Sequence, residues 1–91
     1  MEKTITKPII HINGTSATML TEGYLAAHRA VEGAFDTVSG IEFNARDYYV
    51  SPDPDAWKKA RAEHSARLDK LREVSEELNA IAEHCSQFIK D

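Results

Sequence analysis

The fold of this 91-residue chain is decided by one C-terminal stretch, Trp57–Ile89, which reads WKKARAEHSARLDKLREVSEELNAIAEHCSQFI. A 4-3-4-3 spacing runs through it and selects Trp57, Arg61, His64, Leu68, Leu71, Ser75, Leu78, Ala82, Cys85 and Ile89. Residues spaced in this way share one side of an α-helix, so the pattern predicts a long amphipathic helix over 54–89. A second apolar row widens this side enough to meet more than one partner helix, and consists of Ala60, Val74, Ile81 and Phe88.

The predicted helix is uneven along its apolar side. From Leu68 onward the side is mostly aliphatic, whereas Arg61 and His64 stand near its start, where a coiled coil would carry leucine. An unpaired buried charge is very unfavourable, so Arg61 needs a carboxylate, a carbonyl or an anionic ligand. Two explanations stay open: a carboxylate of another subunit, or a bound anion.

A second helix is predicted over 16–39. Thr15 and Ser16 suit a helix N-cap, and Gly40 suits a C-terminal stop. Between them an apolar stripe repeats at helical spacing, made by Leu20, Tyr24, Ala27, Val31, Phe35 and Val38. Residues 1–14 precede this helix as an arm. Its apolar stretch Ile9–Ile12 suits either a short strand or an extended segment that ends at Asn13-Gly14.

The connection at 40–53 is too long for a tight turn between helices, and it closes at Asp53, a predicted N-cap, with Pro54 in the first helical position. At 1.5 Å per residue the two helices are about 36 and about 53 Å long, so the longer one must overhang. The loop, the arm or another subunit would cover this overhang. We therefore expect a mainly α single domain: an antiparallel two-helix hairpin with an extended N-terminal arm and a long ordered loop, assembling into a helical-bundle homo-oligomer, most simply a dimer.

Composition narrows the classes of function. A net charge of −4 argues against general nucleic-acid binding, and no apolar run is long enough for a membrane span. The lone Cys85 has no disulfide partner, which indicates a cytoplasmic protein. The four histidines are widely separated and no catalytic set is evident, so we expect no metal, no cofactor and no enzymatic activity.

Three groups of polar residues are candidates for binding a small anionic, nucleotide-like ligand. They are His11, Asn13, Thr15 and Ser16 before the first helix; Arg46, Asp47, Tyr48 and Tyr49 in the loop; and Arg61, His64 and Arg67 in the second helix. Arginine fixes phosphate, tyrosine stacks on a planar base, and a helix N-terminus favours an anion. The same residues equally suit structural roles: helix capping, packing of tyrosine over the hairpin end, and a surface ion pair between Arg46 and Asp47.

Three motifs carry a resemblance: His11-Ile-Asn-Gly-Thr-Ser16, Arg46-Asp-Tyr-Tyr49 and Glu63-His64-x-x-Arg67. With them the chain resembles a group of small proteins encoded by phages and prophages, and its expected architecture is similar to oligomeric phage hairpins that act as sponges for nucleotide immune signals. The resemblance implies a phage origin rather than an activity. Because compact phage proteins of this size are typically host-interaction factors, a host-defence inhibitor in the cytoplasm of a bacterial host is the expectation. Two functions follow as expectations: a non-enzymatic binding protein that sequesters a nucleotide-like ligand, or a protein-interaction module that binds and inhibits a host protein.

Overall fold

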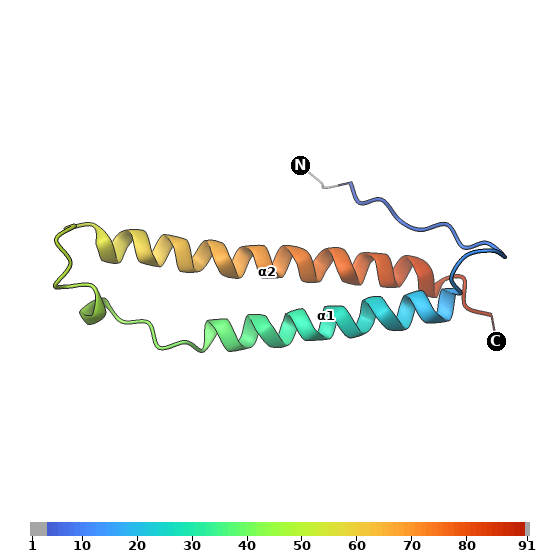
Figure 1. Ribbon diagram of the computed structural model, residues 1–91, viewed down its shortest axis with the longest axis horizontal. Coiled ribbons are helices and arrows are strands. Elements are labelled where there is room, and N and C mark those ends of the chain that lie inside the picture. The colour runs from blue at the N-terminus through green and yellow to red at the C-terminus, as the bar shows by residue number, and fades with distance from the viewer. Residues whose placement is uncertain (1–3, 91) are drawn as a thin grey trace.

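Two long antiparallel helices lie side by side in the computed structural model, which describes residues 4–90 (Figure 1). Helix α1 spans Ala17–Ser39 and helix α2 spans Ala56–Ser86, while a single 3₁₀ turn, η1 at Ala45–Asp47, lies in the connecting loop. The described residues contain no strand. The molecule measures 61 × 26 × 17 Å, and the expected mainly α hairpin is confirmed.

Helix α1 begins and ends where its local signals placed it, to within one residue. The hydroxyl of Ser16 accepts a hydrogen bond from the backbone N–H of Met19 at 3.1 Å, which is the capping geometry expected of a serine. At the other end the N–H of Gly40 donates to the carbonyls of Asp36 and Thr37, at 3.1 and 3.2 Å. These bonds satisfy backbone groups that the helix itself leaves free.

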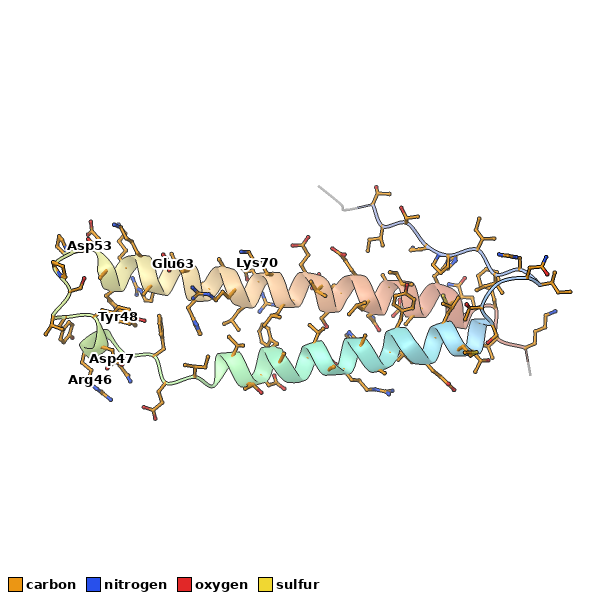
Figure 2. The ribbon with its side chains drawn as sticks, in the orientation of Figure 1. Arg46, Asp47, Tyr48, Asp53, Glu63 and Lys70 are labelled. Atoms are coloured by element: carbon orange, nitrogen blue, oxygen red, sulfur yellow. The ribbon has the colours of Figure 1, made fainter. Side chains whose placement is uncertain are left out.

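Helix α2 is shorter than the predicted 54–89 at both ends. The N-cap is Asp55 instead of the predicted Asp53, because a turn, in which the N–H of Ala56 donates to the carbonyl of Asp53 at 3.1 Å, precedes the helix. The carboxylate of Asp53 stabilises this turn by accepting hydrogen bonds from the N–H of Asp55 at 2.9 Å and from the ammonium of Lys59 at 2.8 Å. Figure 2 labels Asp53 at this end of the molecule. After Ser86 the chain continues in tighter turns, in which the N–H of Phe88 reaches the carbonyl of Cys85 at 3.1 Å.

The fully buried part of the contact between α1 and α2 consists of small side chains. The buried residues in the described part of the chain are Ala17, Thr21, Ser75, Ala82 and Cys85. Small residues let two helices approach closely, but they hide little apolar area. The accessible surface is 7091 Å², whereas a compact monomer of 10.2 kDa exposes about 5,300 Å². The radius of gyration is 18.9 Å, against about 12 Å for a compact chain of this length.

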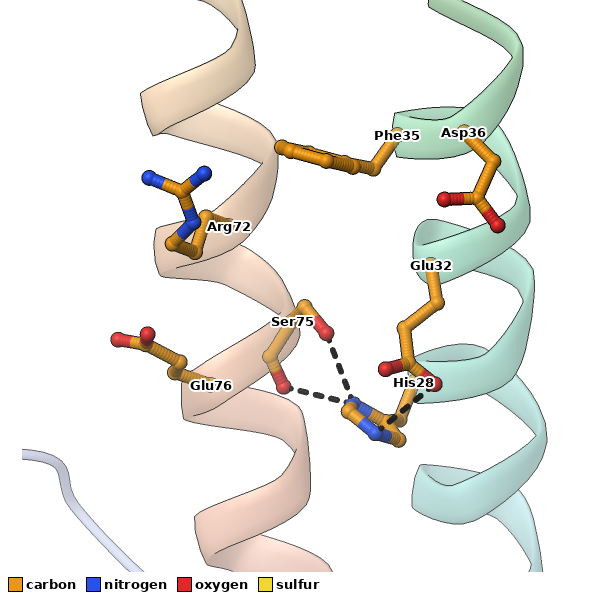
Figure 3. A pocket seen from close by; sticks show the side chains of 7 residues that line it. All are labelled: His28, Glu32, Phe35, Asp36, Arg72, Ser75 and Glu76. Carbon is orange, nitrogen blue, oxygen red and sulfur yellow. Dashed lines mark hydrogen bonds and ion pairs between the residues drawn. The ribbon is translucent and has the colours of Figure 1, made fainter. Parts of the chain in front are cut away.

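One polar link crosses the contact between the helices. The Nδ1 atom of His28 lies 2.9 Å from both the hydroxyl and the carbonyl oxygen of Ser75, and its Nε2 atom lies 3.2 Å from a carboxylate oxygen of Glu32 (Figure 3). Both ring nitrogens therefore have a partner. Because the partners are on two helices, the link fixes how far α1 can slide along α2.

The N-terminal arm runs back along the outer side of α2 (Figure 1). The ring Nε2–H of His84 donates to the carbonyl of Pro8 at 2.9 Å and ties the arm to the helix. Ile9–Ile12 does not form a strand: residues 9–11 have no regular secondary structure, Ile12 already belongs to the following turn, and the described residues contain no strand to pair with. The arm ends in a turn in which the N–H of Gly14 donates to the carbonyl of His11 at 3.0 Å.

The polar link gives a prediction about stability. We expect His28→Ala to lower the free energy of unfolding by about 1–3 kcal/mol, because Ser75 loses its partner inside the contact.

Thr21 offers the opposite case, since its buried hydroxyl has no hydrogen-bond partner. Replacing it by the similarly shaped valine, Thr21→Val, should raise the free energy of unfolding by up to about 1 kcal/mol. Urea denaturation at one fixed protein concentration measures both changes.

The matched control is Arg29→Ala, which removes the exposed neighbour of His28 and should change the free energy of unfolding by less than about 0.5 kcal/mol. Equal losses for His28→Ala and Arg29→Ala would show that the link between the helices contributes nothing to stability.

Candidate functional site

The structure divides the predicted ligand-binding residues between the two ends of the hairpin. The turn that carries His11, Asn13, Thr15 and Ser16 precedes α1, whereas the loop and the start of α2 lie at the opposite end of a molecule 61 Å long (Figure 1). Antiparallel packing causes this separation, because it places the N-terminus of α1 beside the C-terminus of α2. A single chain therefore does not bring the three groups into one site.

The loop end is organised by an aromatic cluster, which consists of Phe43, Tyr48, Trp57 and His64. The ring of Phe43 stacks on His64 with 4.6 Å between centroids, and it lies 5.0 Å from Trp57. Tyr48 packs at 5.8 Å from Phe43 and 5.7 Å from Trp57. These rings cover the part of α2 that extends beyond α1, so the loop is the segment that covers the overhang.

Phe43 was missed as an organising residue by reasoning from sequence. Its position in the loop gave no periodic signal, and the neighbouring Tyr48 and Tyr49 carried more recognisable chemistry. The available signal was composition alone: Phe43 is a large apolar residue in a connection next to a helix that begins with Trp57. Through this cluster Tyr48 and His64 take structural roles, since both pack against Phe43.

A second set of loop residues points to solvent. We call Arg46, Asp47, Tyr49 and Val50 the loop tip. Tyr49 is 73% exposed and Val50 93% exposed, although both side chains are largely apolar. The backbone beneath them is held by the η1 turn, in which the N–H of Tyr48 donates to the carbonyl of Ala45 at 2.9 Å. The loop therefore contains residues that pack in the aromatic cluster and residues that face solvent. Figure 2 shows Arg46, Asp47 and Tyr48 at this end of the molecule.

The arginines of α2 are on the surface. The guanidinium of Arg61 lies 5.7 Å from the ring centroid of Trp57, a cation–π distance, and Arg61 is exposed. Arg67 pairs with Glu63 at 3.8 Å, with both side chains more than half exposed. The first turns of α2 face the loop instead of a helix, so Arg61 reaches water and needs no buried carboxylate partner.

Three open grooves are found elsewhere on the described chain. The first, of about 520 Å³, is polar and is lined by His28, Glu32, Phe35, Asp36, Arg72, Ser75 and Glu76 (Figure 3). The second, of about 600 Å³, lies beside the arm, and the third, of about 280 Å³, is apolar. No loop-tip residue lines any of them.

The polar groove is a poor site for a phosphate. Three carboxylates surround it, on Glu32, Asp36 and Glu76. Its arginine, Arg72, is already engaged, lying 5.2 Å from the ring centroid of Phe35 and 3.2 Å from the carboxylate of Asp69. Like charges raise the free energy of a bound anion. The groove also contains a Glu-His-Ser array, but the N–H groups beside Ser75 lie in the middle of α2, where helical bonding leaves no donors for an oxyanion.

A comparison with protein families, with curated proteins and with solved structures finds no match for this chain. In the part of the chain that the structure describes, neither helix is long and apolar enough to cross a membrane. The same residues contain no group of three or more His, Cys, Asp or Glu side chains that could hold a metal ion. Cys85 is fully buried in the contact between the helices.

The two adjacent tyrosines of the loop should differ in how much their substitution changes the free energy of unfolding. Tyr48→Ala should lower the free energy of unfolding by about 2–4 kcal/mol, because it removes a ring from the aromatic cluster. Tyr49→Ala should change the free energy of unfolding by less than about 0.5 kcal/mol, because Tyr49 is exposed. Urea denaturation followed by Trp57 fluorescence measures both. Similar losses in the free energy of unfolding for the two variants would contradict the distinction between the packed Tyr48 and the exposed Tyr49.

The turn before α2 predicts a dependence of stability on pH. The hydrogen bond from Lys59, together with that from the Asp55 N–H, lowers the pKa of Asp53, and the same pair raises the pKa of Lys59. A lowered carboxyl pKa stabilises the folded state above the unfolded value, near pH 4, and this contribution is lost as pH falls through the folded value. Asp53→Asn should therefore lower the melting temperature at pH 7, and the difference from the wild type should shrink to nothing near pH 2.

The matched control is Glu42→Gln, which removes an exposed carboxylate from the same loop. Its melting temperature should follow that of the wild type at both pH values. A deficit of Asp53→Asn that persists at low pH would mean that the carboxylate charge is not the cause.

Proposed function

We propose that this chain is a non-enzymatic protein-interaction module that works as a homo-oligomer and binds a partner protein through its loop tip. The observation that carries the proposal is the exposure of Tyr49 and Val50 on a backbone held in place by the aromatic cluster. Tyrosine and arginine are enriched among the residues that dominate protein interfaces, and a preorganised loop loses little entropy on binding. Arg46 and Tyr49 are therefore the expected centre of the interface.

Geometry favours a protein partner over a small ligand at this end of the chain. Small-molecule sites are concave and bury most of the ligand. None of the three grooves described above has a loop-tip residue in its wall. The turn with Asn13, Thr15 and Ser16, which was expected to complete an anion site, belongs to the opposite end of the same molecule. A convex, partly apolar loop tip suits a protein surface better.

Self-association is the second part of the proposal. The chain exposes about a third more surface than a compact monomer of its mass. Large apolar side chains contribute to this exposure, among them Met19 and Val74, and burying them against another copy would recover apolar area. A dimer of hairpins forms a four-helix bundle, which is a common closed arrangement for antiparallel helices.

A nucleotide-like ligand bound between subunits is the second candidate function. It is favoured by the antiparallel hairpin itself: two hairpins that pair head to tail place the turn of one copy and the loop of the other at the same end. Arg46 and Arg61 would then face phosphate, Tyr49 would stack on the base, and the N–H groups before α1 would complete the site. The resemblance to phage proteins makes a bacterial host the source of either partner.

The loop tip provides the test. Immobilised chain should capture a defined protein from bacterial extract, and the purified partner should bind the double variant Arg46→Ala, Tyr49→Ala at least tenfold more weakly than the wild type. Arg29→Ala removes an exposed arginine far from the loop and should bind as the wild type does. Binding measured by calorimetry with the purified partner decides between these results. Equal affinity for both variants would contradict a loop-tip interface.

Thermal-shift measurements distinguish the second candidate function. A nucleotide or cyclic nucleotide that stabilises the wild type but not Arg46→Ala would favour the shared ligand site over the protein interface. Absence of any shift, together with loss of partner binding in the double variant, would favour the protein interface.

A further inference from the structure

The hairpin has two unlike sides. The polar groove opens between the helices on one side, with Glu32 and Asp36 from α1. The apolar groove opens on the other side and is lined by Met19, Leu20, Gly23, Tyr24 and Ala27 of α1 with Leu78 of α2. At 100° per residue, these two sets of α1 residues fall on opposite flanks of the line along which α1 meets α2. Of these two grooves, only the polar one is lined by carboxylates.

Charge is confined to one strip of α1. The charged residues of this helix are Glu22, Arg29, Glu32 and Asp36. At 100° per residue they span only about 80° of the circumference. The remaining exposed positions are apolar or small, with Met19, Gly23, Ala26, Ala30 and Ala34 among them. We call the set Met19, Gly23, Ala27, Ala30, Ala34 and Val38 the apolar face.

The single chain leaves this face without a packing partner. Met19 is 66% exposed, and Val74 of α2, next to the apolar groove, is 45% exposed. A Cβ atom added to Gly23, which belongs to this face, would meet no atom of another part of the chain within 4 Å. A glycine destabilises a helix by about 1 kcal/mol relative to alanine, so packing within the chain does not explain Gly23.

A second copy of this chain fits the apolar face by area and by charge. The accessible surface of 7091 Å² exceeds that of a compact monomer by about 1,800 Å², and a standard interface needs about 800 Å² from each partner. A symmetric contact also keeps the charged strip of α1 in water in both copies, so no charge of α1 is buried. Self-association therefore accounts for both the excess accessible surface and the confinement of charge to one strip of α1.

We propose that two copies pair through their apolar faces with α1 antiparallel to α1 across a two-fold axis; this rests on the homo-oligomer in the proposed function. The face positions 19, 23, 27, 30, 34 and 38 have spacings of 4, 4, 3, 4 and 4, which read the same in both directions. An antiparallel two-fold axis thus pairs Met19 with Val38, Gly23 with Ala34 and Ala27 with Ala30. Small residues meet at the centre, where the backbones approach, and larger ones meet at the ends.

This arrangement has a consequence for the predicted ligand residues. The turn at His11–Ser16 of one copy and the loop of the other lie at the same end of the dimer. The dimer thereby brings together the turn and the loop, which lie at opposite ends of a single chain. This happens once at each end of the dimer.

Sedimentation or light scattering of the full chain tests the interface. We expect a wild-type mass of twice the 10.2 kDa chain mass. Ala30→Glu places a charge in the centre of the interface and should weaken association at least 100-fold, which gives a monomer at micromolar concentration. Ala66→Glu makes the same change at an exposed position of α2 away from the apolar face and should remain dimeric. Circular dichroism confirms that both variants are helical.

The possible outcomes separate the two proposals. A monomeric wild type would overturn both the homo-oligomer and this interface. An oligomeric wild type that Ala30→Glu leaves intact, or that Ala66→Glu disrupts equally, would overturn the interface alone.

Cross-linking tests the orientation. Under the antiparallel pairing, Gly23→Cys and Ala34→Cys chains should form a disulfide when mixed and oxidised, whereas each variant alone should form little. A parallel pairing predicts the reverse, with each variant coupling to itself. The native Cys85 is fully buried and provides the internal control, since the unmodified chain should not cross-link. Self-coupling, or no coupling in the mixture, would overturn the antiparallel arrangement.

Discussion

The close contact between α1 and α2 is the constraint on which the rest of the structure depends. Ala17, Ala82 and Cys85 are small enough to let the helices approach, and His28 with Ser75 fixes their relative position. A contact of this kind sets the register but hides little surface, because two helices can shield only one strip of each other. The larger apolar side chains are consequently left at the edges of the contact. This explains how a chain with well-defined helices can expose so much apolar area.

The unequal lengths of the helices determine the architecture of the loop. Helix α2 has 31 residues and α1 has 23, so the first turns of α2 have no partner helix. Phe43 and Tyr48 take that place by packing on Trp57, and this packing gives the loop a fixed conformation. The loop tip is presented as a result of the same packing, since the inward side chains hold the backbone from which Tyr49 extends. Neighbouring residues of one short segment thus differ in role: Phe43 and Tyr48 hold the loop in place, and Tyr49 is exposed on its surface.

The two sides of the hairpin have different electrostatic properties, and this difference separates their roles. Carboxylates of Glu32, Asp36 and Glu76 surround the polar groove, which disfavours anions and keeps that side hydrated. The apolar side has no such groups on α1, so another helix can approach it without burying charge. The proposed self-association would use one side of the hairpin, and the proposed partner binding would use the loop end, so the two would not compete for the same residues. A chain of 91 residues can therefore accommodate both proposals.

Local signals in the sequence determined the two helices, the Ser16 cap and the stop at Gly40, because each depends on residues within a few positions of one another. The boundaries of α2 were less predictable, because the chain forms a separate turn from Asp53 to Ala56 before the helix, and the helix starts only at Ala56. The tertiary structure alone decided which polar groups lie together. The direction of packing sends the turn at Asn13–Ser16 and the loop to opposite ends, and periodicity along one helix contains no information on that point. It also decided that Tyr48 packs and Tyr49 is exposed, because that distinction depends on where the ring of Phe43 lies in space.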